Sequence, residues 1–116
     1  MSDIKRMTSA RITVNRGDSA SVPLEITYPD GSQFIPDELA GEKITFTVRS
    51  APKSDENEVL IQKNVTGTRI EIEPEDTQEL EYGSYIFDVE VVWMKDEELE
   101  TKTVIIGQLA VLAEVT

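Results

Sequence analysis

The sequence predicts an all-β domain, built as an antiparallel sandwich of about seven strands. Along most of the chain, apolar residues alternate with polar ones at a period of two, as expected for strands with one buried face. Turn-forming glycine, proline, asparagine and aspartate separate these runs at short intervals. No segment carries the apolar period of a long helix.

The first two runs predict strands on either side of a glycine turn. Ile12 and Val14 share one face of the first strand, which ends at Arg16-Gly17-Asp18. Pro23 lies in the second run and lacks a backbone N–H, so we expect this strand at a sheet edge or with a bulge. Pro29-Asp30-Gly31 then predicts a turn, since glycine accepts a positive φ. The inward residues of the second strand are Val22, Leu24, Ile26 and Tyr28.

A loop and three further strands follow in the middle of the chain. We expect residues 33–42 to form the loop, with Leu39 as a plug in the core. Residues 51–58 are polar and predict an exposed loop, and residues 66–68 predict a turn. The strands between these connections have their inward residues at Ile44, Phe46 and Val48, then over residues 59–65, and then at Ile70 and Ile72.

The last third of the chain predicts a helical turn and a long hairpin. Proline and acidic residues at 74–77 suit the first turn of a helix. The longest strand is expected over residues 84–94, with Tyr85, Phe87, Val89, Val91 and Trp93 on its inward face. A charged tip at 95–98 leads into a final run over residues 100–115, which we expect to break at Gly107. On the outward face, Asp88 and Glu90 alternate with the core, and Asp88 could pair with a cross-strand lysine or arginine.

Composition limits both the class of protein and the kinds of site. At 116 residues the chain has the length of one domain. We expect residues 10–116 to form it and residues 1–9 to be a flexible N-terminal segment. The chain has no cysteine and no histidine, which excludes disulfides, cysteine-based zinc sites and the commonest general base. No sequence signal predicts a cofactor.

The charge is strongly acidic. A formal net charge of -12 disfavours binding to nucleic acid phosphates and to anionic membrane surfaces. No apolar run is long enough to cross a bilayer, and residues 1–9 lack the hydrophobic core of a signal peptide. We therefore expect synthesis in the cytoplasm, with neither nucleic acid nor a membrane as a partner.

A corner motif narrows the sandwich to the immunoglobulin-like (Ig-like) type. In Ig-like sandwiches, a tyrosine near the start of the sixth strand hydrogen-bonds back to the chain arriving from the fifth. Tyr85 is placed for that role, and Gly83 allows a tight approach. Leu80 is expected to anchor the helical turn that contains Asp76 against the core. We predict a structural corner made of Asp76, Leu80, Gly83 and Tyr85, in preference to an exposed tyrosine for ligand contact.

Other motifs give weak signals of chemistry. Arg16-Gly17-Asp18 matches the integrin-recognition tripeptide, but a turn between two strands explains it better. Carboxylates gather at residues 55–58, 73–76 and 96–98, without the spacing of a calcium-binding loop. No metal site is predicted, although weak Ca²⁺ binding in these loops stays open. A hydrolase that uses carboxylates alone is the least favoured function, because it needs two acids facing each other across a cleft.

Four aromatic residues could contribute to a sugar-stacking surface: Tyr28, Phe34, Tyr82 and Trp93. Trp93 is the only tryptophan and lies at the far end of the inward row, so we expect it in the core or at its rim. An exposed Trp93 would instead favour a carbohydrate-binding module.

Two stretches carry a resemblance to a known family. One is Phe-Thr-Val-Arg at residues 46–49, and the other is Pro-x-Asp-Thr-x-x-Leu-x-x-Gly-x-Tyr-x-x-Asp-Val-Glu at residues 74–90. From about Ile12 to Thr116, the chain resembles the Ig-like N-terminal domain of baseplate upper proteins and related small tail or prophage proteins of phages that infect Gram-positive bacteria. The resemblance implies a virion structural part that docks to other tail subunits and is not an enzyme. Longer members continue into linkers and receptor-binding-related regions, so a standalone accessory protein or a prophage remnant is expected here.

We therefore expect a non-enzymatic phage or prophage structural protein, associated with the tail or baseplate. Its expected partners are other phage structural proteins or further copies of itself, reached through an edge strand or a loop face. In an intact phage its location would be the virion. The alternative, from a different class, is a carbohydrate- or cell-wall-binding Ig-like module, and the exposure of Trp93 distinguishes the two.

Overall fold

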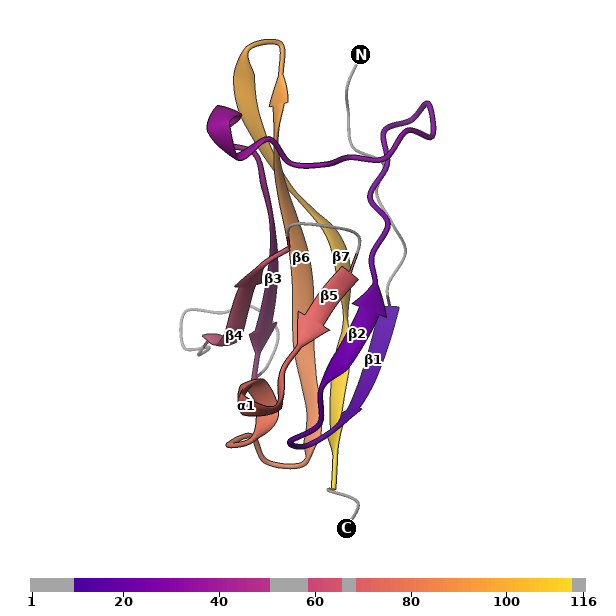
Figure 1. Cartoon of the computed structure of the whole chain (residues 1–116), viewed down its shortest axis with the longest axis vertical. Coiled ribbons are helices and arrows are strands. Elements are labelled where there is room, and N and C mark those ends of the chain that lie inside the picture. Colours follow the sequence, from indigo (N-terminus) through magenta and orange to yellow (C-terminus); the bar gives the residue numbers. More distant parts are fainter. Residues whose placement is uncertain (1–9, 51–58, 66–68, 114–116) are drawn as a thin grey trace.

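The structure is a computed structural model that describes residues 10–50, 59–65 and 69–113. Within these residues, seven strands form a five-stranded sheet of order β1-β7-β6-β3-β4 and a two-stranded sheet of β2 and β5 (Figure 1). The elements are β1 (Ala10–Asn15), β2 (Ala20–Pro23), the 3-10 turn η1 (Glu38–Ala40), β3 (Lys43–Arg49), β4 (Val59–Asn64), β5 (Arg69–Ile72), α1 (Pro74–Thr77), β6 (Gly83–Lys95) and β7 (Glu98–Leu112). The predicted mostly-β fold with about seven strands is confirmed.

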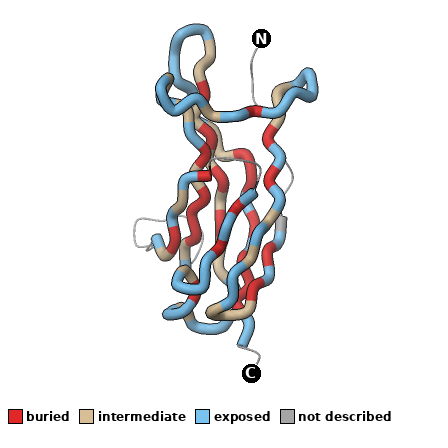
Figure 2. Tube along the Cα trace, viewed as in Figure 1, coloured by how far each residue is buried: buried red, intermediate tan, exposed pale blue. Residues whose placement is uncertain are grey.

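One hydrophobic core lies between the two sheets (Figure 2). The smaller sheet contributes Ile70 and Ile72, which are both buried as predicted. Tyr85, at the start of the inward row of β6, is only partly buried. The predicted inward residues of β3 and the rest of that row are confirmed as buried: Ile44, Phe46, Val48, Phe87, Val89, Val91 and Trp93.

β1 departs from the predicted antiparallel arrangement. It pairs with β7 in parallel, from Ala10 opposite Gly107 to Asn15 opposite Leu112. The other pairs between described strands are antiparallel, so the larger sheet is mixed. After β1 the chain crosses to the smaller sheet, which means that β1 and β2 do not form a hairpin. Alternation shows which face of a strand is buried but not the direction of its neighbour, and the fully antiparallel prediction was wrong for this reason.

β2 lies at a sheet edge, as predicted from Pro23. Among the described strands it pairs with β5 alone, and it ends at the proline. Leu24 and Ile26 remain buried beyond the end of β2. The row of inward-facing side chains therefore continues past the residues that pair with β5. The turn predicted next is also present, since Gly31 has a φ of 90° and its N–H donates to the carbonyl of Tyr28 at 2.9 Å.

Leu39 lies outside the core, contrary to the prediction. Its side chain is fully exposed, at 101%. η1 is a single turn, in which the Asp37 carboxylate accepts the Leu39 N–H at 3.1 Å and Gly41 ends the turn with a φ of 87°. This turn directs Leu39 outward, while Phe34 from the same segment is buried in the core.

β7 continues without the break that was predicted at Gly107. The glycine is buried and pairs regularly with Ala10 on one side and Phe87 on the other. The irregularity lies earlier in the strand, where β7 has one extra residue, Val104, relative to β6. Val104 and Ile105 are both buried, so two successive apolar residues mark the bulge better than the glycine does.

The remaining predictions divide between confirmed elements and segments outside the described residues. The helical turn predicted at 74–77 is α1. The strand predicted at 84–94 is β6, and β7 rather than β6 is the longest strand described. The N-terminal segment 1–9, the loop at 51–58 and the turn at 66–68 lie outside the described residues. In the part of the chain that the structure describes, no helix has the length and apolar character of a membrane span.

Candidate interaction surfaces

Three of the predicted corner residues fix how the chain enters β6. The Tyr85 hydroxyl donates to the backbone carbonyl of Glu81 at 2.6 Å. Leu80 is partly buried and packs against the core. Gly83, the first residue of β6, has a φ of 145°, which residues with a side chain rarely adopt.

Asp76 holds the other end of the corner through two contacts. Its carboxylate accepts the backbone N–H of Glu73 at 2.7 Å and closes the capping box of α1. The same carboxylate lies 2.7 Å from the Lys63 ammonium, on β4. The ion pair therefore links α1 to β4, which stands at one end of the strand order of the larger sheet. The sequence did not indicate this role for Lys63, because the pairing depends on how two distant segments meet.

A Tyr85→Phe substitution is expected to lower the free energy of unfolding by about 1 kcal/mol, the usual net value of one hydrogen bond. The ring keeps its packing, and only the donor to the Glu81 carbonyl is lost. Denaturant unfolding measures the change. Tyr82→Phe is the matched control, since this ring is 52% exposed, and its effect is expected to stay within about 0.5 kcal/mol. Equal losses in the two variants would contradict the prediction.

A buried threonine joins the corner to the turn after β1. Thr77 is fully buried, and its Oγ1 accepts the backbone N–H of Gly17 at 3.0 Å, across a separation of 60 residues. Beside this contact, the Arg16 guanidinium lies 4.4 Å from the ring centroid of Tyr82. The Arg16-Gly17-Asp18 tripeptide therefore forms a turn that packs on the corner.

Two of the three acidic clusters lie among the described residues. At the β6–β7 tip, Asp96 and Glu97 have φ values of 50° and 68°, and they form the tight turn of the hairpin. In the cluster at 73–76, the Asp76 carboxylate already binds the Glu73 N–H and the Lys63 ammonium, and the Glu73 and Glu75 carboxyl groups are hydrogen-bonded to each other. In the ranges 10–50, 59–65 and 69–113, no group of three or more potential ligand side chains is placed to hold a metal ion. The cluster at 55–58 lies outside these ranges.

Glu73 and Glu75 interact at the start of α1. A hydrogen bond between the two carboxyl groups, together with the repulsion between their charges, raises the pKa of Glu73. A raised pKa in the folded state means that folding favours the protonated form. The stabilising contribution is therefore present in acid and is lost as the pH rises through the raised pKa.

A Glu75→Gln substitution is expected to lower the pKa of Glu73 and to remove this loss of stability at neutral pH. The amide can still donate a hydrogen bond to Glu73, and it brings no like charge. NMR titration of the Glu73 carboxyl and unfolding at acidic and neutral pH measure the two effects. Glu79→Gln changes the net charge equally at a separate exposed position. The prediction fails if Glu73 titrates alike in the parent and in both variants.

Most of the aromatic candidates cannot form a sugar-stacking surface. Trp93 is 4% exposed and Phe34 is 2% exposed, so the core position expected for Trp93 is confirmed. Tyr28 is partly buried and packs edge-on against Phe34, with ring centroids 5.9 Å apart. Tyr82 is exposed, but Arg16 lies over its ring. The carbohydrate-binding alternative therefore lacks the tryptophan platform on which it depended.

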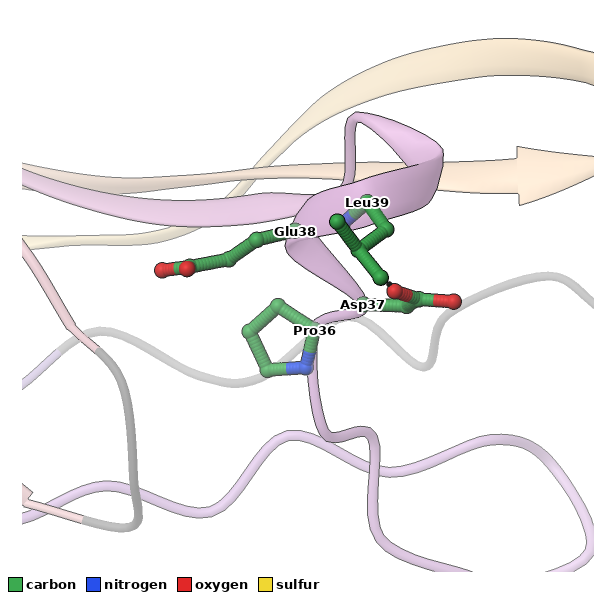
Figure 3. A pocket seen from close by; sticks show the side chains of 4 residues that line it. All are labelled: Pro36, Asp37, Glu38 and Leu39. Carbon is green, nitrogen blue, oxygen red and sulfur yellow. Dashed lines mark hydrogen bonds between the residues drawn. The ribbon is translucent and has the colours of Figure 1, made fainter.

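A hollow near η1 is lined by consecutive residues of one segment (Figure 3). Pro36, Asp37, Glu38 and Leu39 spread from a single turn and do not converge from different elements. Glu42 fastens this segment to β6, because its two carboxylate oxygens accept the N–H of Asp37 at 3.0 Å and the N–H of Met94 at 2.7 Å. The hollow is thus the surface of a well-anchored loop.

The face of the five-stranded sheet that points away from the core, called here the outer face, is open along β7. Leu99, Ile106 and Leu112 lie on it and are each about half exposed, at 49%, 51% and 47%. They are three of the seven large apolar side chains exposed among the described residues. On the neighbouring β6, the register places partly buried apolar side chains on the same face: Ile86, Val92 and Met94.

The outer face is low in charge. It carries five charged residues by strand alternation, namely Arg11, Lys43, Arg49, Asp88 and Glu90. Arg49 and Asp88 form an ion pair, which confirms the cross-strand partner predicted for Asp88. The face therefore has a formal charge of +1, whereas the whole chain has -12.

Several strand edges have no partner among the described strands. β4 pairs with β3 alone, and β2 and β5 pair only with each other. Among the described residues, β1 pairs with β7 from Gly107 to Leu112, and residues 98–106 pair with β6 alone. Such edges offer backbone donors and acceptors for strand addition.

Comparison with known proteins found no matching family model and no matching curated protein.

Proposed function

We propose that the protein is a non-enzymatic structural module of a phage or prophage tail, associated with the baseplate, which works through protein–protein contacts. The outer face carries the proposal, because half-exposed apolar side chains lie there on a surface with little charge. The family-like motifs at 46–49 and 74–90 support the same role. In an intact phage the protein would be synthesised in the cytoplasm and located in the virion.

We also propose that the two sheets form an Ig-like sandwich. In that fold the third, sixth and seventh strands share one sheet, and the second and fifth share the other. The strand order of this chain follows that grouping, with β1 and β4 added to the larger sheet. The hydrogen bond from Tyr85 to the Glu81 carbonyl supports the assignment, since it lies at the entrance to the sixth strand.

Virion association tests the proposed function. A tagged full-length chain would be expressed in the source bacterium while its phage or prophage is induced, and virions would be purified by density gradient. The chain is expected to co-fractionate with tail proteins and to be captured with them from disrupted virions. A folded chain that is absent from virions and from every tail-protein complex would overturn the proposal.

A further inference from the structure

We infer that the outer face is a homodimer interface, on which a second copy of this chain packs about a two-fold axis. The inference rests on the proposed function and deepens it by naming the surface and the partner. Three properties of the face support a second copy as the occupant. They are the arrangement of its apolar side chains, its charge and its area.

The apolar side chains of the outer face form two groups with a polar row between them. The row is formed by Glu90, which stands opposite Thr45 on one side and Thr103 on the other. A two-fold axis that runs across the strands at this row would place each group against the other group of the partner. The surface is then complementary to itself, as an isologous contact requires. The first group is Val92, Met94 and Leu99. The second is Ile86, Ile106 and Leu112, together with Val59 on β4, which stands opposite Arg49.

Charge favours the outer face over the rest of the surface for contact between two copies. Two chains of net charge -12 repel each other, so their contact has to avoid the acidic regions. The outer face has three basic residues against two acidic ones, and one of each is already paired as Arg49–Asp88. A basic partner of another kind would instead be attracted to the acidic corner at α1 or to the hairpin tip.

The area of the face suits a small, reversible interface. Five strands about 4.8 Å apart, over a length of about 30 Å, give a projected area of about 600 Å². A standard interface buries about 800 Å² on each partner, and weak complexes bury less. We therefore expect a dimer that dissociates on dilution.

Sedimentation equilibrium of the full chain is expected to show a monomer–dimer equilibrium. Ile106→Glu places a carboxylate in the second apolar group and should raise the dimer dissociation constant by about tenfold or more. Ile35→Glu is the matched control, because it makes the same change in a loop where the side chain is 69% exposed, compared with 51% for Ile106. This control should leave the dissociation constant unchanged. Circular dichroism and the unfolding midpoint verify that both variants are folded.

Ionic strength provides a second measurement. Salt screens the repulsion between two acidic chains, so the dimer is expected to tighten as salt is raised. A complex with a basic partner would weaken under the same change. Weakening of the self-association by salt would therefore count against the proposed interface.

The outcomes separate this inference from the proposed function. A wild-type chain that stays monomeric up to millimolar concentration would overturn the dimer. Equal weakening by Ile35→Glu and Ile106→Glu would overturn the outer face as its interface. A monomer that still co-purifies with tail proteins overturns the dimer and supports the proposed function. A dimer that is sensitive to Ile106→Glu but absent from virions supports the interface and contradicts the proposed function.

Discussion

A Phe46→Ala substitution is expected to lower the free energy of unfolding by about 3–5 kcal/mol, the usual cost of removing a large buried ring. Phe46 is fully buried on β3, and its ring centroid lies 5.4 Å from that of Phe87 on β6. The substitution would leave a cavity in the core beneath β3. Because β3 is paired with β4 and β6 on its two sides, it cannot move in to fill this space. Since domains of this kind are stable by about 5–15 kcal/mol in total, the variant should be close to unfolding at room temperature.

Urea unfolding followed by tryptophan fluorescence measures this loss well. Trp93 is the only tryptophan and is buried in the same core, so its emission reports the global transition. Leu39→Ala is the control, because that side chain is fully exposed and its truncation should cost less than about 0.5 kcal/mol. A loss in Leu39→Ala as large as that in Phe46→Ala would contradict a core built around Phe46.

A Thr77→Val substitution is expected to cost about 1–3 kcal/mol, although it hardly changes the shape of the side chain. The loss comes from the Gly17 N–H, which would keep its position beside α1 but lose the hydroxyl that accepts its hydrogen bond. Thr77→Ser retains the acceptor and should recover most of this cost. The two variants therefore separate the hydrogen bond from the packing of the methyl group.

Hydrogen exchange of the Gly17 amide gives a local measurement of the same contact. Exchange should accelerate in Thr77→Val and stay close to that of the parent in Thr77→Ser, under conditions where both are folded. Equal protection of Gly17 in the parent and in both variants would show that the Thr77 hydroxyl does not hold the turn after β1.

The sequence predicted those features that depend on one strand at a time. The alternation around Phe46 and Phe87 identified the buried faces, because each side of a strand is read directly from a period of two. A local pattern also predicted α1. Proline and acidic side chains favour the first turn of a helix, and this preference does not depend on distant parts of the chain. Pro23 likewise indicated an edge strand from its missing donor.

Features that depend on two distant segments could not be predicted in this way. The parallel pairing of β1 with β7, the Lys63–Asp76 ion pair and the contact of Thr77 with Gly17 join residues far apart in the chain. The prediction for Leu39 was wrong for a different reason. This residue was placed in the core only because its side chain is apolar, although it lies in a polar loop and is exposed. The outer face was also missed, since its apolar residues alternate with core residues and become a surface only when β6 and β7 pair.

The parallel pairing of β1 with β7 has a mechanical consequence. The chain enters β1 at Ala10, opposite Gly107, and leaves β7 at Leu112, beside the far end of β1 (Figure 1). A tensile force applied through the two ends of the domain would pull these strands past each other along their length. The hydrogen bonds between the six paired positions would then resist as a group in shear, instead of opening one after another. Under tension applied through both ends, this pair of strands would be the part of the fold that carries the load.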